Sequence, residues 1–254
     1  MGWRLLVWAL SNLRWSRASS SIEMSNDYLI SKLVHDGVVG SKAVERVLRH
    51  IDRRTFTTSI DPPFGRASSH EAYRDAPLSI GGGQTISAPH MHARALEFLA
   101  PKLDHPNATA LDVGSGSGYL TAALALIRSD TKAYGVEIID ELTKVSYENI
   151  RTDATLAAEL LDGPDARVSF FTGDGARGLA SHAPYDAIHV GAAARKVPRA
   201  LLEQLKPGGR LVIPVGDPGR AQYFTAVDKM EDGTFSAVEL FGVRYVPLVT
   251  DECE

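Results

Sequence analysis

The sequence has almost no cysteine and no long apolar run, and each absence excludes a class of protein. Its 254 residues include one cysteine, Cys253, which has no partner for an internal disulfide bond. Such a composition suits a reducing compartment. No stretch approaches the roughly 18 consecutive apolar residues of a membrane-spanning helix, so we expect no membrane partner. The net charge of −4 lacks the basic excess of a nucleic-acid-binding surface, so we expect no nucleic-acid partner either.

The first 22 residues contain no acidic side chain, although they carry Arg4, Arg14 and Arg17 and several serines. This composition is typical of an amphipathic segment that directs a protein to an organelle such as the mitochondrion. A poorly ordered extension, or a translation start at Met24, is the alternative that we favour. We therefore expect residues 1–24 to form an extension and the protein to be cytoplasmic, with a mitochondrial location as the alternative.

The strongest pattern in the chain is a glycine-rich turn between a strand and a helix. Residues 108–113 form a short apolar run of the kind that a strand buried on both faces shows. Gly114, Gly116 and Gly118 follow at alternate positions, and residues 119–128 read as a helix rich in Ala and Leu. Strand, glycine turn and helix form the first half of a nucleotide-binding βαβ unit, whose ligand lies at the carboxyl end of the strand.

Two acidic residues narrow the class of ligand. Asp112 stands two residues before the first glycine, where a carboxylate suits a ligand with an ammonium group better than a pyrophosphate. Glu137 ends the next apolar run, where a carboxylate can accept hydrogen bonds from both ribose hydroxyls. An adenosine with a cationic amino-acid tail, S-adenosyl-L-methionine, satisfies both. The spacing G-x-G-x-G also differs from the G-x-G-x-x-G of dehydrogenases. A hydride-transferring dehydrogenase is therefore the least favoured of the candidate functions.

The rest of the chain predicts an α/β fold. Residues 57–88 show little periodicity, so we expect a long loop that covers a cofactor. Strands that alternate with helices and end in a hairpin around Asp232-Gly233 predict a mostly parallel central sheet with helices on both faces and an antiparallel C-terminal edge. We expect helices over residues 26–35, 41–51, 89–100, 140–151 and 198–205, and strands over residues 133–137, 167–172, 185–190, 210–215, 222–230 and 235–249.

With these motifs in place, the chain resembles the protein-L-isoaspartate (D-aspartate) O-methyltransferase family from about residue 26 to 250. The glycine turn alone is shared by many methyltransferases. The two segments that are specific to this family are residues 85–92 (TISAPHMH) and 188–194 (IHVGAAA), and residues 79–81, 173–175, 205–216 and 243–248 also match. The resemblance implies a Rossmann-like class I methyltransferase, in which residues 25–254 form one domain with an N-terminal helical cap.

The resemblance also implies an activity and a set of site residues. The enzyme would transfer the methyl group of S-adenosyl-L-methionine to the free α-carboxylate of L-isoaspartyl and D-aspartyl residues in damaged proteins, as a monomer and without a metal. Ser87 would orient the acceptor carboxylate, and Val246 would lie along the bound peptide. The implied cofactor-binding residues are Gln84, Thr85, Ile86, Ser87 and His92 at the border with the acceptor, Asp112, Gly114, Ser115 and Gly116 around the methionine part, Glu137 and Ile138 at the ribose and adenine edge, and Asp174 and Gly175 at the adenine.

Several residues have a structural alternative. Ser87 could be only the N-cap of a helix that Pro89 opens. His90 and His92 are too close in sequence for a helical metal pair, so we interpret them as structural or cofactor contacts. His189 lies inside a strand that we expect to be buried, so we predict that it is a hydrogen-bonded core residue. Val249 stands where the family often has threonine, which puts a cofactor contact there in question.

Other functions stay open on the sequence alone. A related methyltransferase with another acceptor would share Asp112 and Glu137 but would not need the segment around Ser87. A binding module without activity would keep the cofactor fold and show no turnover.

Overall fold

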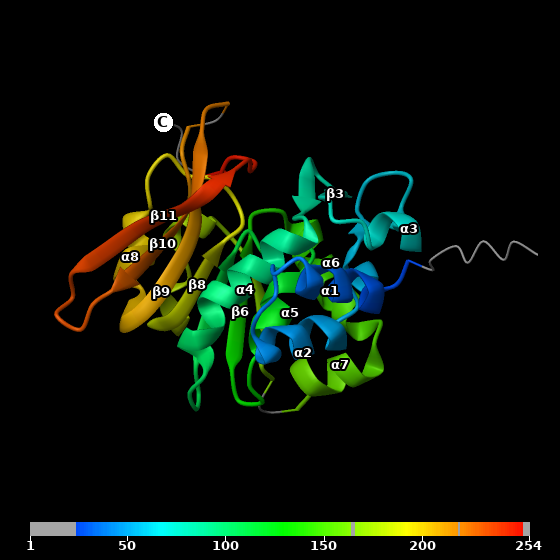
Figure 1. Ribbon diagram of the computed structural model, residues 1–254, viewed down its shortest axis with the longest axis horizontal. Helices are drawn as coiled ribbons and strands as arrows, with labels where there is room; N and C mark the ends of the chain where they lie inside the picture. The colour runs from blue at the N-terminus through cyan, green and yellow to red at the C-terminus, as the bar shows by residue number, and fades with distance from the viewer. Residues whose placement is uncertain (1–23, 164–165, 218, 251–254) are drawn as a thin grey trace, which may run out of the picture.

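A computed structural model of the protein describes residues 24–163, 166–217 and 219–250. Residues 1–23 of the expected extension and Cys253 lie outside this part of the chain. Seven of the described strands form one sheet: β5 (Thr109–Val113), β6 (Lys132–Glu137), β7 (Val168–Thr172), β8 (Tyr185–Val190), β9 (Leu205–Val215), β10 (Gln222–Lys229) and β11 (Phe235–Val243). Their spatial order is β11-β10-β9-β8-β5-β6-β7 (Figure 1).

The sheet is parallel from β9 to β7 and antiparallel at its other edge. β5 pairs in parallel with both β6 and β8, whereas β10 pairs antiparallel with β9 and β11. The predicted sheet with an antiparallel C-terminal edge is thus confirmed. After β5 the chain builds β6 and β7 on one side and then returns to place β8 on the other. The carboxyl ends of β5 and β8 therefore flank a topological switch point, where open α/β sheets bind their ligands.

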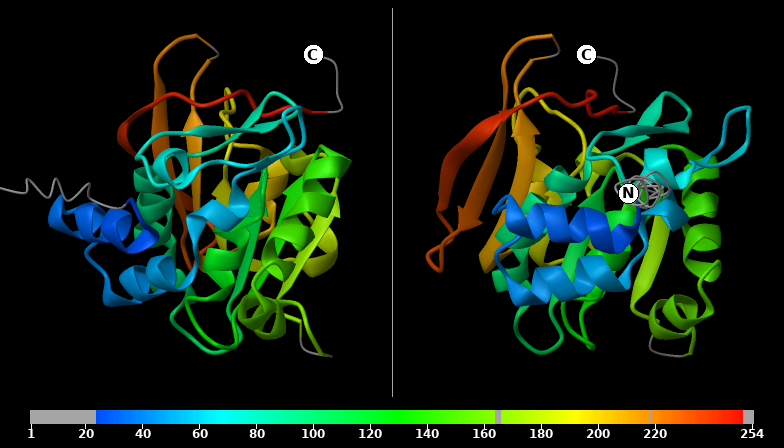
Figure 2. Two further views of the ribbon diagram at one scale, coloured as in Figure 1. Left: turned by 90° about the vertical axis from the view of Figure 1, so that its right-hand side faces the viewer. Right: turned by 45° about the vertical axis from the view of Figure 1, so that its right-hand side comes forward.

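Helices cover the two faces of the sheet unequally (Figures 1 and 2). On one side of the sheet lie α4 (Pro89–Leu103), α5 (Tyr119–Ala125), α6 (Asp140–Arg151) and α7 (Ala154–Leu160). On the same side, α2 (Lys42–His50) packs against α4, and α1 (Asn26–His35) packs against α2. The other face packs against the short α8 (Arg199–Glu203), near the 3₁₀ turns η2 (Gly175–Arg177) and η3 (Ala180–His182). No helix in the described part of the chain is long and apolar enough to cross a membrane.

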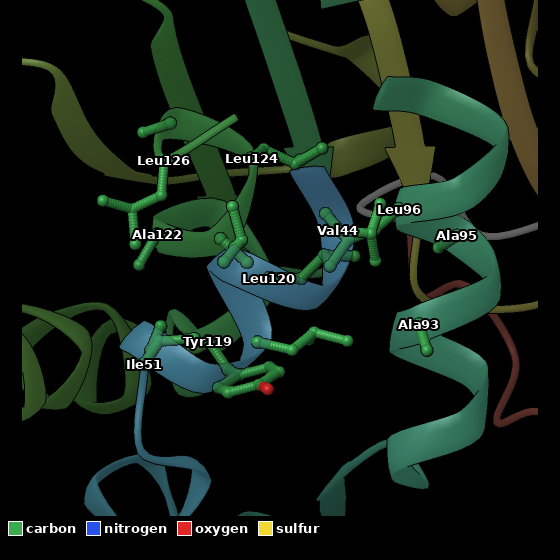
Figure 3. Close-up of a cluster of buried hydrophobic side chains, with 14 of the residues drawn as sticks. Val44, Ile51, Ala93, Ala95, Leu96, Tyr119, Leu120, Ala122, Leu124 and Leu126 are labelled. Atoms are coloured by element: carbon green, nitrogen blue, oxygen red, sulfur yellow. The ribbon is translucent and has the colours of Figure 1, made fainter. Parts of the chain in front are cut away.

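The two N-terminal helices pack on the same core as the sheet. Figure 3 shows α2 between α4 and α5, where Val44, Leu96 and Leu120 lie together. Ser41 caps α2 because its side chain accepts the N–H of Val44, so the helix predicted over residues 41–51 begins at Lys42. The carboxylate of Glu97 accepts the N–H groups of Gly40 and Ser41 at 2.9 and 2.8 Å, which ties the entry of α2 to α4.

The prediction of a loop without regular structure over residues 57–88 is wrong, because this segment contains short strands and a helix. It comprises two short hairpins, β1 (Thr58–Ser59) with β2 (Gly65–Arg66) and β3 (Leu78–Gly81) with β4 (Gln84–Ile86), together with α3 (Ser69–Ala72). These elements are too short to show a hydrophobic period. The capping box of Ser68 and Glu71 was the one local signal for α3.

Other element boundaries also differ from the prediction. β9 begins at Leu205 rather than Arg210, because Leu205 pairs with Tyr185 before residues 206–209 bulge out of the ladder. This early start shortens the predicted helix over 198–205 to α8, with Pro198 as its N-cap. α7 was not predicted, and β11 ends at Val243, six residues before Val249.

We predict that Gly118→Ala lowers the free energy of unfolding more than the same substitution does at a left-handed glycine with free space around it. Gly118 has φ 87°, and an added Cβ would lie 2.8 Å from Cζ of Phe170 and 3.0 Å from Cβ of Ser146. Strain and overpacking together should cost roughly 2–4 kcal/mol. Gly37→Ala is the matched control, because Gly37 has φ 69° and no atom within 4 Å of an added Cβ, so it should lose only about 1–2 kcal/mol. Equal losses for both variants in urea unfolding would contradict this packing argument.

Candidate active site

Three adjoining hollows open at the carboxyl ends of β5, β6 and β8. The cleft runs from Glu137 and Ile138 past the glycine turn, the inner pocket lies above Asp112, and the outer groove opens beside Ser87 and Tyr245. Figure 2 shows the β3–β4 hairpin and the chain that follows β11 both lying across this end of the sheet. Thr85 and Gly191 line all three hollows, so the three form one continuous site.

Glu137 links the end of β6 to the glycine turn. Its Oε2 accepts the N–H of Gly116 at 2.9 Å, and its Oε1 accepts the N–H of Ile139 at 3.1 Å. Burial raises the pKa of this carboxyl, while the backbone N–H groups that it accepts oppose the rise. Two hydrogen bonds leave the carboxylate with further acceptor sites toward the cleft. Glu137 therefore lies where a ligand with neighbouring hydroxyls could bind.

Asp112 is buried near the carboxyl end of β5. Its Oδ2 accepts the hydroxyl of Thr121 at 2.6 Å, and its Oδ1 lies 2.7 Å from Nδ1 of His189 on β8. The prediction that His189 is a hydrogen-bonded core residue is confirmed. His189 also lines the inner pocket together with Asp112, which the sequence alone did not indicate.

The inner pocket contains polar atoms that the protein itself does not satisfy. Among the described residues, Nδ1 of His92 and Oγ of Ser115 are buried without a hydrogen-bond partner. Buried polar groups are nearly always paired, so two orphans in one pocket indicate a polar ligand. The ring of His92 packs on Tyr119 with 4.9 Å between centroids. Burial, and secondly the charge of Arg53, hold the pKa of His92 well below 6.5, so this ring is neutral at pH 7.

The β3–β4 hairpin brings Gln84, Thr85, Ile86 and Ser87 to the site. Gln84 and Thr85 line the cleft, and Ile86 and Ser87 line the inner pocket. The interpretation of Ser87 as only a helix N-cap is wrong, because Ala88 is the N-cap of α4 and that cap has no side-chain hydrogen bond. Ser87 instead lines the outer groove beside Tyr245, close enough to the phenol for the two hydroxyl groups to interact.

The other predicted residues divide between the hollows and the adjoining turn. Gly114 and Gly116 line both the cleft and the inner pocket, and Ile138, Gly175 and Val246 line the cleft. Asp174 does not line any of the three hollows. Its carboxylate accepts the N–H of Ala176 at 2.9 Å and caps η2, so here it acts as a turn residue beside the site. Its predicted contact with adenine stays a prediction.

Residues far apart in the sequence complete the walls. Gly191 and Ala192 follow β8, and Pro247, Leu248 and Val249 follow β11. The isolated bridge between Ala193 and Pro247 holds these two loops together. The sequence analysis did not assign Gly191, Ala192, Pro247 or Leu248 to the site, because no local pattern tells which loops meet. Val249 does line the cleft, although it has no hydroxyl to offer a ligand.

The donor set fits an amphiphilic ligand of the size of an adenosine derivative. Asp112 and Glu137 supply negative charge at two strand ends, while Ser115 and His92 supply unpaired polar atoms between them. Apolar walls come from Val136, Ile138 and Leu248. Among the described residues, neither the cleft nor the inner pocket is lined by a lysine or an arginine, so the two carboxylates there disfavour a phosphate ligand and favour a cationic one.

Comparison with known proteins agrees with this geometry. The sequence model of the family described as protein-L-isoaspartate(D-aspartate) O-methyltransferase matches residues 24–253. Protein-L-isoaspartate O-methyltransferase of Triticum aestivum is 47% identical over 92% of this chain and 94% of its own length. Protein-L-isoaspartate O-methyltransferase 1 of Arabidopsis thaliana is 44% identical over 94% of this chain and 96% of its own.

A solved structure shows the same fold. A putative protein-L-isoaspartate O-methyltransferase from Plasmodium falciparum, solved with S-adenosyl-L-homocysteine, superposes with a TM-score of 0.75 at 28% identity over 89% of this chain and 99% of its own. The seven-stranded sheet and the glycine turn define a Rossmann-like class I methyltransferase. The chain belongs to the protein-L-isoaspartate(D-aspartate) O-methyltransferase family.

We predict that His92 makes the protein sensitive to mild acid. The unfolded chain protonates His92 near pH 6.5, whereas burial keeps the folded state neutral to a lower pH. Its contribution is therefore complete above pH 6.5 and is lost as the pH falls toward the folded-state pKa, by at most about 1.4 kcal/mol per pH unit.

The test compares melting temperatures between pH 8 and pH 5. His92→Gln should flatten the acid side of the profile relative to the wild type. His70→Gln, at an exposed position of α3, controls for the removal of a histidine from the surface. Parallel profiles for the wild type and His92→Gln would show that His92 is not the group responsible.

Proposed function

We infer that this protein transfers the methyl group of S-adenosyl-L-methionine to the free α-carboxylate of L-isoaspartyl and D-aspartyl residues in damaged peptides and proteins, which starts their repair. The observation that carries this inference is the family match over residues 24–253, which includes every wall of the site. The fold and the acidic, partly unsatisfied donor set support the same cofactor.

The reaction requires little acid–base catalysis from the protein. A carboxylic acid with a pKa near 4 is already ionised at neutral pH, so no general base is needed to form the nucleophile. The bound cofactor supplies a methyl group on a positively charged sulfur, which leaves as a neutral thioether when the acceptor oxygen takes the methyl group. The protein must align the acceptor and exclude water, and such alignment can contribute roughly 7–11 kcal/mol.

Each part of the site has a role in that alignment. Asp112, held by Thr121 and His189, and the unpaired Ser115 and His92 would bind the amino-acid end of the cofactor. Glu137 would accept the ribose hydroxyls at the other end. A neutral His92 avoids placing a second cation beside the sulfonium.

The acceptor side is separate from the cofactor side. Ser87 lies at the border between the inner pocket and the outer groove, so its hydroxyl can donate to an acceptor carboxylate that enters from the groove. Val246 lines both the groove and the cleft, as expected for a residue beside the bound peptide. The β3–β4 hairpin above them shields the reacting atoms from water.

The direct test uses two peptides that differ only in one isoaspartyl or aspartyl linkage. With methyl-labelled cofactor, the wild-type protein should label the isoaspartyl peptide and leave the aspartyl peptide unlabelled. The label should be lost in alkali, because carboxyl methyl esters hydrolyse there. Equal labelling of both peptides, or of neither, would overturn the proposed function.

Ser87→Ala separates this function from methyl transfer to another acceptor. The substitution should lower kcat/KM for the isoaspartyl peptide by about tenfold or more, because a hydrogen bond to a charged group is worth about 1.5–3 kcal/mol. Unchanged turnover in Ser87→Ala would favour an acceptor that does not use this hydroxyl.

We predict that Glu137→Gln weakens cofactor binding by about tenfold, through the loss of a charged acceptor for the ribose. Titration calorimetry with S-adenosyl-L-homocysteine measures the effect. Glu141→Gln, at an exposed position in the first turn of α6, is the matched control and should bind as the wild type does. The same dissociation constant for Glu137→Gln and Glu141→Gln would contradict the role of Glu137.

The cellular setting is a further part of this proposal. The single cysteine supports a reducing compartment such as the cytoplasm, and the net charge of −4 supports protein substrates rather than nucleic acid. We propose in addition that the protein is a monomer. Light scattering of the purified protein tests the oligomeric state. N-terminal sequencing of the natural protein distinguishes the cytoplasm from the mitochondrion, since a removed leader would favour the latter.

A further inference from the structure

The segment that follows β11 is held in place by an unusual partner, a side-chain amide. The last rung of the β10–β11 ladder pairs Gln222 with Val243. Beyond it, Oε1 of Gln222 accepts the N–H of Tyr245 at 2.7 Å, and Nε2 of Gln222 donates to the carbonyl of Tyr245 at 3.3 Å. One buried glutamine thus replaces the next rung of the sheet and fixes the backbone of Tyr245 from both sides.

A second anchor holds the same segment at the site. The N–H of Ala193 donates to the carbonyl of Val246, and the N–H of Leu248 donates to the carbonyl of Ala193, both at 2.8 Å. Ala193 belongs to the loop after β8, which also contributes Gly191 to all three hollows. Tyr245 therefore has a defined position relative to both β10 and the switch point.

The phenol of Tyr245 lies beside the hydroxyl that the acceptor needs. Tyr245 and Ser87 both line the outer groove, and their hydroxyl groups are close enough to interact. Burial raises the pKa of Tyr245 to about 12, so the phenol keeps its proton at neutral pH. A serine hydroxyl has one proton, and without a partner it rotates among three staggered positions.

We propose that Gln222 and Tyr245 are positioning residues for methyl transfer: Gln222 fixes Tyr245, and the phenol of Tyr245 holds Ser87 so that its single proton is donated to the acceptor carboxylate. When an acceptor is bound, the phenol donates to Oγ of Ser87, and Ser87 donates to the carboxylate. Neither residue transfers a proton or forms a covalent bond. The proposal rests on the proposed function, since it describes how that acceptor is oriented.

The first test removes the phenol oxygen. Tyr245→Phe should lower kcat/KM for the isoaspartyl peptide by about tenfold, with the dissociation constant of S-adenosyl-L-homocysteine unchanged. Tyr223→Phe is the matched control, because the Tyr223 side chain lies on the exposed side of β10, 41% exposed, and should leave both values unchanged. Equal kcat/KM in Tyr245→Phe and the wild type, or a loss confined to cofactor binding, would overturn the role of Tyr245.

A double-mutant cycle separates positioning from simple loss of structure. In a Ser87→Ala background, Tyr245→Phe should cause no further loss of kcat/KM, because the phenol acts through a hydroxyl that is already absent. Losses that multiply across the two substitutions would show that Tyr245 acts independently of Ser87 and would overturn the proposed chain.

Gln222 is tested in the same assay. Gln222→Met removes both hydrogen bonds and should lower kcat/KM for the peptide at saturating cofactor, whereas Gln222→Glu keeps the acceptor for the Tyr245 N–H and should recover part of the activity. Gln204→Met is the matched control: Gln204 also bridges backbone groups, the N–H of Leu179 and the carbonyl of Arg177, away from the groove. It should lower the melting temperature but not kcat/KM.

The outcomes distinguish a failure of this proposal from a failure of the proposed function. A wild-type protein that does not label isoaspartyl peptides overturns the proposed function and this role together. Wild-type activity with equal losses in Gln222→Met and Gln204→Met overturns only the role of Gln222.

Discussion

The buried carboxylate of Asp112 is the constraint around which the site is built. A carboxylate in the interior is costly unless it is hydrogen-bonded on both oxygens, and Thr121 from α5 and His189 from β8 supply those bonds. This requirement fixes α5, β5 and β8 relative to one another at the switch point. The glycine turn lies directly above, and Glu137 fastens it to the neighbouring strand. The position of the cofactor site therefore follows from the hydrogen bonds that the buried Asp112 carboxylate needs.

Much of this centre is predictable from the sequence because its signals are local. The apolar run before Gly114, the alternating glycines and the acids at positions 112 and 137 all lie within 30 residues of chain. Short-range patterns of this kind report a strand, a turn and a helix directly. The edge hairpin of β10 and β11 is predictable for the same reason, since Asp232-Gly233 separates two β-rich runs. The assignment to a family came from longer motifs, not from these periods.

The rest could not be predicted because it depends on contacts between distant segments. The pairing of Leu205 with Tyr185 decides where β9 begins, and no residue near Leu205 reveals it. Likewise Ser87 looks like a helix cap, and only the tertiary structure shows that it lines a groove beside Tyr245 instead. The orphaned atoms of Ser115 and His92 are visible only once burial is known. Local propensity thus locates the cofactor centre, and tertiary structure defines the acceptor side.

The anchoring of Tyr245 at the outer groove also has a consequence for the kinetics of folding. The outer groove joins two segments that are distant in the sequence, Thr85 and Ser87 at the β3–β4 hairpin and residues 243–246 at the end of β11, so its contacts are non-local. Contacts of this kind form late, because a large loop must close before they are gained. A partly folded chain could thus assemble the sheet and its glycine turn while still lacking the groove. On the proposed function, recognition of the damaged peptide would then require the complete native state.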